Sequence, residues 1–367
     1  MTDGMIIIRL DPEFPLEDVE AIGARLVASG ALVPAYVPPD AGLLSIAAFR
    51  FTQGIDQTET RILPDRNLVS RMARLARDGA DQPLEGPAAV AADLMAFAQA
   101  MDLLIEPSIA FHELAHREDN AIALGELSWF RAADHGQAKA WIDLAQGRID
   151  RLPIAVPKPE DKRDLAYPLN RWRRNYVVAL KIAELELAAM KPLERALSLF
   201  QWMADDFFMA GPAAIFATMY FAPFAARRRM LKQLRSADRE RAIAGIKNAA
   251  WDITHLSNLV AERKRSETEN IFFIFATADR GLAQIAPVLM IDADEDDYAA
   301  ELVRGLSAWW PAAEALHLAE TLFLHIRSAK GRAAPTRALI PKDSIQGLIS
   351  LGEARIRAWS GPSNPRS

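Results

Sequence analysis

The sequence of 367 residues contains no cysteine. Without thiols the chain forms no disulfide, no thiolate zinc site and no cysteine nucleophile, and we expect a reducing, cytoplasmic location. The chain also has no excess of positive charge, because 43 lysines and arginines stand against 48 acidic residues and the formal net charge at pH 7 is −5. This balance excludes a protein coated in positive charge, so any binding of nucleic acid must come from a local patch.

Long apolar runs are few. The run Met5–Ile8 is too short for a signal peptide. One uncharged stretch, residues 207–226, has the length of a membrane span and precedes three arginines. Because Gly211, Pro212 and Pro223 interrupt this stretch, we interpret it as a buried helix and expect no stable membrane association.

The sequence does contain strand patterns that each lead into a helix, which is typical of an α/β core with a parallel sheet. Strands are predicted at residues 5–10, 43–51, 61–63 and 271–276. Helices are predicted at residues 16–29, from about 65 to 79, from Pro87, from Pro107, over 165–236 without any strand, and at 239–264, 296–329 and 344–359. Since the last strand is far from the others in sequence, the helical stretch between them is interpreted as an insertion or second lobe.

We therefore expect five regions. They are the N-terminal part of the α/β core at 1–150, a helical insertion lobe at 151–240 that opens with a proline-rich linker, the C-terminal part of the core at 241–295, C-terminal helices at 296–360 and a disordered tail at 361–367.

Four acidic residues are the candidates for chemistry. Asp65 and Asp279 each follow a predicted strand, where ligands bind in open parallel sheets. Glu113 and Asp252 lie on the apolar faces of predicted helices. Buried carboxylates that lie close together repel one another unless a cation lies among them, and oxygen ligands favour Mg²⁺ or Mn²⁺. Structural roles remain open, because the two aspartates suit helix N-caps and the other two acids suit pairing with arginine or buried hydrogen bonds.

In this order the acidic motifs resemble those of the PIN-domain nucleases. The matching segments are ILPDRN with Asp65 and Asn67, SIAFHEL with Glu113, AAWDITHL with Asn248 just before it and Asp252 within it, and FATADRGL with Thr277 and Asp279. The resemblance covers roughly residues 60–130 and 245–290. The proline before Asp65 and the large helical insertion depart from the family's pattern.

The resemblance implies a PIN-like parallel sheet flanked by helices, with a large all-helical insertion or second lobe. It also implies that the four acids hold the Mg²⁺ or Mn²⁺ ion that cleaves RNA, with DNA as the alternative substrate, and that Asn67 and Thr277 support them. Asn248, one turn before Asp252 on the same helix face, is a further supporting candidate. A further hypothesis is a PIN-like scaffold that has no catalytic activity and binds a protein partner or a second copy of the chain through the helical lobe.

A second motif, which predicts a different activity, also contains Glu113. HELAH, residues 112–116, matches H-E-x-x-H, the zinc-peptidase signature. On this reading His112 and His116 bind Zn²⁺, Glu113 is the general base, and Glu126 is the candidate third ligand. The charged sequence that follows is atypical of such helices, and this reading leaves the three aspartates without a role.

Two basic clusters are candidates for contact with nucleic acid. The first contains Arg171, Arg173 and Arg174 around Trp172, and the second contains Arg227, Arg228 and Arg229 with Lys232. Arginine pairs well with phosphate, and an aromatic ring can stack on a base. The alternative for both clusters is a solvated helix face.

Overall fold

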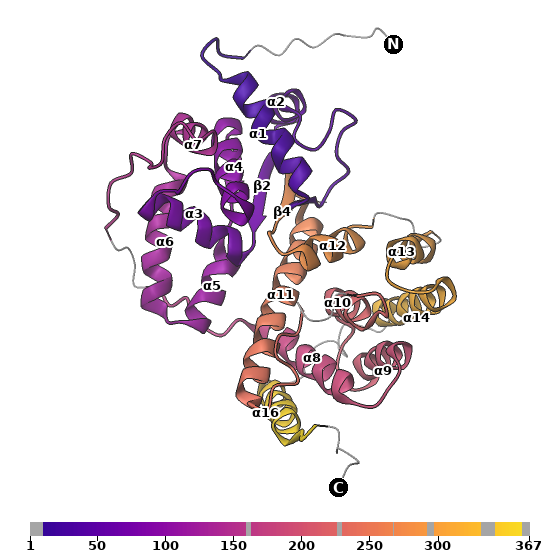
Figure 1. Ribbon diagram of the computed structural model, residues 1–367. Helices are drawn as coiled ribbons and strands as arrows, with labels where there is room; N and C mark the ends of the chain where they lie inside the picture. The colour runs from indigo at the N-terminus through magenta and orange to yellow at the C-terminus, as the bar shows by residue number, and fades with distance from the viewer. Residues whose placement is uncertain are drawn as a thin grey trace, which may run out of the picture. The chain divides into compact units, whose positions relative to one another are not determined.

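A computed structural model of the chain describes residues 10–158, 163–225, 230–266, 268–291, 297–331 and 342–361 (Figure 1). Three earlier predictions fall outside these ranges wholly or almost wholly. They are the strand at 5–10, the arginine cluster at 227–229 and the tail at 361–367.

The chain divides into two compact units. The first contains residues 1–167 and 261–283, and the second contains residues 168–260 and 284–367. The first unit holds the sheet together with helices α1 (Leu16–Ser29), α2 (Ile46–Gly54), α3 (Arg66–Asp78), α4 (Gly86–Met101), α5 (Ser108–Arg117), α6 (Asn120–Asp134) and α7 (Ala138–Ala145). The described part of the second unit contains helices only: α8 (Asn170–Leu187), α9 (Pro192–Asp205), α10 (Gly211–Phe221), α13 (Tyr298–Leu306), α14 (Ala312–Gly331) and α16 (Lys342–Ala358). Helices α11 (Arg239–Ser266) and α12 (Arg280–Leu289) each contribute residues to both units.

The sheet of the first unit has four strands in the order β1-β4-β2-β3. Strands β2 (Glu59–Pro64), β3 (Leu104–Ile105) and β4 (Ile271–Ala276) are parallel, whereas β1 (Leu32–Pro34) pairs antiparallel with β4. Strands β2 and β4 agree with the predicted strands, and β1 and β3 are not predicted. The sheet is therefore mixed. In the register of the two central strands, Pro64 lies opposite Ala276, so β2 and β4 end at the same level.

The strand predicted at 43–51 is wrong, because this segment forms the start of α2. The side chain of Ser45 caps the helix by accepting a hydrogen bond from the backbone N–H of Ala48. The buried residues of α2 are Ile46 and Phe49, which have the i, i+3 spacing of a helix face. A local cap together with one buried face outweighs the alternating pattern of apolar residues.

Several other boundaries agree with the predictions. Helix α1 begins and ends where expected, and α3 ends before Gly79, which has a positive φ of 82°. Pro87 lies in the first turn of α4, and Pro107 directly precedes α5. The core of this unit packs buried strand residues such as Ile62 and Ile274 against these helices.

The uncharged stretch that begins at Phe207 contains α10, and residues 213–221 of this helix are all buried. Within the described ranges, no helix is long and apolar enough to cross a membrane. In the same unit, a Cβ atom built on Gly245 of α11 would lie 1.9 Å from the carbonyl oxygen of Lys232. The segment that begins at Met230 therefore runs directly against the backbone of α11.

Candidate active site at the ends of β2 and β4

Asp65 stands at the end of β2 and begins α3. Its carboxylate Oδ1 accepts a hydrogen bond of 2.9 Å from the backbone N–H of Leu68, so it is the N-cap of the helix. Its own backbone N–H donates to the carbonyl oxygen of Ala276 in β4, at 2.8 Å. The residue is only 3% exposed. Asp65 therefore joins the helix cap to the neighbouring strand.

Thr277 links the ends of the two strands through its side chain. The hydroxyl Oγ1 donates to Oδ2 of Asp65 at 2.5 Å and accepts from the backbone N–H of Asp279 at 3.0 Å. Thr277 is 1% exposed, so both bonds are shielded from water. Asp65, Thr277 and Asp279 thus form one hydrogen-bonded chain at the carboxyl edge of the sheet.

Asp279 is the N-terminal cap of α12. Its Oδ1 accepts hydrogen bonds from the backbone N–H groups of Gly281, at 2.7 Å, and Leu282, at 3.3 Å. Its Oδ2 accepts none from the described residues, and the side chain is half-buried. Asp279 therefore has one carboxylate oxygen available to a ligand from outside the chain.

Glu113 lies on the buried face of α5, as its apolar neighbours predict, and forms an ion pair of 3.5 Å with Nη1 of Arg117 one turn later. Asn67 lies in the first turn of α3 and is exposed. Asp252 and Asn248 belong to the second unit, where Nδ2 of Asn248 donates to Oδ2 of Asp252 at 3.5 Å. These two residues are therefore described with the second unit and not with the edge formed by Asp65, Thr277 and Asp279.

Asp65 and Asp279 offer the carboxylate oxygens that a hard divalent cation prefers, and Glu113 of α5 is a third carboxylate of the same unit. As the side chains lie, however, the described residues contain no group of three or more His, Asp or Glu that could hold a metal ion. These described residues therefore provide the type of ligand atom that Mg²⁺ or Mn²⁺ prefers, but three of them are not arranged around one metal position.

The zinc alternative meets a specific obstacle at Glu126. This carboxylate accepts hydrogen bonds from Nη1 of Arg66 at 2.9 Å and from the hydroxyl of Ser70 at 3.2 Å. On α5, Nδ1 of His112 donates to the carbonyl oxygen of Leu165 at 2.7 Å, and Nδ1 of His116 donates to that of His112 at 2.8 Å. The third ligand proposed for Zn²⁺ is thus engaged in an ion pair that the sequence does not reveal.

The described basic cluster on α8 is engaged within its own unit. Arg171 donates to Asn258 at 2.7 Å, Arg173 donates to Gln346 at 3.1 Å, and Arg174 lies 5.7 Å from the centre of the Phe208 ring. Trp172 stacks on Tyr176 and packs against Trp251, with centroid distances of 5.0 and 5.4 Å. The Trp172 ring therefore contributes to internal packing of the second unit.

Comparison of the chain with protein-family models, with curated proteins and with solved structures finds no match.

Proposed function

We propose that the first unit is a PIN-like nuclease core that cleaves RNA, with DNA as the alternative substrate, at the edge formed by Asp65, Thr277 and Asp279. The observation that carries this proposal is the hydrogen-bonded chain of these residues where β2 and β4 end together. In parallel sheets this edge is where ligands bind. The order of the acidic motifs along the chain is the second line of support.

The residues of the site have distinct tasks in this proposal. Asp65 is held in one orientation by Leu68 and Thr277, so its negative charge is fixed at the end of β2. Asp279 presents its Oδ2 to an incoming Mg²⁺ or Mn²⁺ ion, and Glu113 adds a further negative charge from α5. When bound, such a cation lowers the pKa of water and acts as a Lewis acid towards a phosphodiester.

The test uses Asp279→Asn, because asparagine caps a helix as well as aspartate does but carries no charge. We expect the variant to keep its fold, to lose Mn²⁺ binding in calorimetry and to lose cleavage of single-stranded RNA. Asp119→Asn is the matched control, since Asp119 caps α6 through the N–H of Ile122 at 2.8 Å. Normal cleavage by Asp279→Asn would show that the assignment is wrong.

A PIN-like scaffold without turnover, acting through a protein partner, is the second candidate. It is favoured by the absence of a three-acid group among the described residues and by the two internal hydrogen bonds of Asp65. This candidate predicts that the wild-type protein neither binds Mn²⁺ nor cleaves RNA or DNA. Zinc binding that is lost in His116→Ala would instead favour the peptidase.

A further inference from the structure

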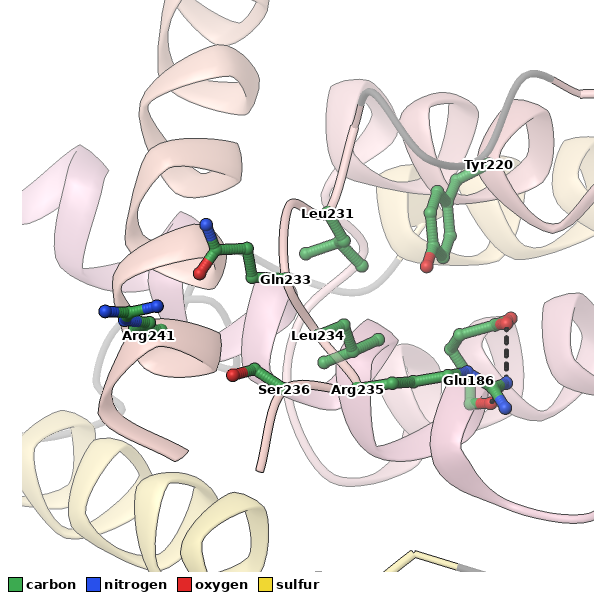
Figure 2. A pocket seen from close by; sticks show the side chains of 8 residues that line it. All are labelled: Glu186, Tyr220, Leu231, Gln233, Leu234, Arg235, Ser236 and Arg241. Atoms are coloured by element: carbon green, nitrogen blue, oxygen red, sulfur yellow. Dashed lines mark hydrogen bonds and ion pairs between the residues drawn. The ribbon is translucent and has the colours of Figure 1, made fainter. Parts of the chain in front are cut away.

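The second unit contains a pocket of about 710 Å³, a volume in the range of small-molecule sites. It is lined by Glu186 at the end of α8, by Tyr220 of α10, by Leu231, Gln233, Leu234, Arg235 and Ser236 of the segment before α11, and by Arg241 of α11 (Figure 2). None of these residues belongs to the nuclease proposal.

One end of the pocket has an unbalanced positive charge. Glu186 is 6% exposed, and its Oε2 accepts a hydrogen bond of 2.6 Å from Nη1 of the buried Arg195. Its Oε1 accepts a second one, of 3.3 Å, from Nη2 of Arg235, which extends towards it in Figure 2. Because one carboxylate lies between two guanidinium groups, one positive charge remains.

Arg235 retains donors that can bind a ligand. Its side chain is 60% exposed, and only Nη2 makes a hydrogen bond within the described residues. The hydroxyl of the next residue, Ser236, accepts a hydrogen bond from the N–H of Asp238 at 3.2 Å and points away from Arg235 in Figure 2, so Arg235 provides the donors at this end. Leu231 and Leu234 supply an apolar wall beside these donors.

Arg241 differs from Arg235 although it lines the same pocket. Its Nε forms an ion pair of 3.3 Å with the carboxylate of Asp238, so its charge is already balanced. Figure 2 shows it on α11, on the other side of the segment 231–236 from Glu186. An anion is therefore attracted to Arg235 more strongly than to Arg241.

We propose that this pocket binds a small organic monocarboxylate with an apolar tail. The carboxylate pairs with the free N–H groups of Arg235, and the tail packs on Leu231 and Leu234. A carboxylate matches the single unbalanced charge, whereas a phosphate monoester would bring a charge of about −1.5 to −2 into the same place.

The experiment measures binding of hexanoate to the full chain at pH 7 by isothermal titration calorimetry and ligand-observed NMR. Hexanol and hexylamine have the same tail without the negative charge. We expect hexanoate to bind at least about tenfold more tightly than either, and Arg235→Gln to remove at least about tenfold of its affinity. Arg241→Gln, the matched control from the same pocket, is expected to change the affinity less than about twofold.

Three results would overturn the proposal. They are no binding of hexanoate, equal binding of hexanoate and hexanol, or unchanged affinity in Arg235→Gln. If Arg235→Gln is poorly folded by circular dichroism, the comparison of the three probes on the wild type still decides whether the site selects a carboxylate.

Discussion

Among single residues, Thr277 connects the ends of β2 and β4, because its buried hydroxyl forms hydrogen bonds with both Asp65 and Asp279. Thr277→Val keeps the shape of the side chain and removes the hydroxyl. The carboxylate of Asp65 then loses a buried, charge-assisted bond, and we expect the free energy of unfolding to fall by about 1–3 kcal/mol in urea titrations.

Thr277→Ser is the control for this variant, since serine keeps the hydroxyl and loses only a methyl group. We expect it to retain most of the stability. Equal destabilisation by valine and serine would mean that packing, and not the bond to Asp65, matters at this position.

The positions of Asp65 and Asp279 at strand ends could be predicted from the sequence because each follows its own apolar run directly. Their connection through Thr277 could not, because Thr277 and Asp65 are 212 residues apart and meet only through the register of β2 and β4. The same holds for Glu126, whose pairing with Arg66 depends on how α3 and α6 pack. Local patterns predict the position of a side chain on its helix or strand. Long-range packing decides which residue that side chain contacts.

Among the elements, α11 lies in close backbone contact with the segment before it, at Gly245. Gly245→Ala places a methyl group against the carbonyl of Lys232, which is backbone and cannot rotate away. We expect the segment that begins at Met230 to be displaced and the stability to fall by about 1–3 kcal/mol or more, measured by thermal unfolding.

Gly347 is the matched control, because it is also helical, within α16, and a Cβ built there has no neighbouring atom within 4 Å. Gly347→Ala should raise the stability by up to about 1 kcal/mol, the usual gain from alanine in a helix. If both substitutions have the same effect, the contact at Gly245 is not the cause.

The predicted bounds of α1 and α3 and the predicted start of α4 lie close to the observed ones. The two outer strands, β1 with three residues and β3 with two, are not predicted from the sequence. Both are short and depend on partners that are far away in sequence. Residues 43–51 were misassigned because alternation over a few residues does not distinguish a strand from a short capped helix.

In the whole molecule, the first unit is assembled from two separate stretches of the chain. Strand β4 comes from the second stretch and lies between β1 and β2. A fragment of residues 1–167 lacks this strand, so we expect it to show no cooperative unfolding in circular dichroism and poorly dispersed NMR signals.

The control joins residues 1–167 to 261–283 through a flexible Gly/Ser linker of about twenty residues. This construction restores β4 and should recover a cooperative transition. A cooperative transition in the shorter fragment would show that β4 is dispensable for the core.

The late position of β4 in the chain also matters during synthesis. Residues 65–270 must be translated between the end of β2 and the start of β4. At about 5–20 residues per second, a ribosome needs roughly ten to forty seconds for them. Throughout that interval the nascent β2 exposes one edge, and β1 lacks β4, its partner among the described strands, so both can pair with other chains. The strand order therefore leaves these edges open to aggregation until β4 has been synthesised.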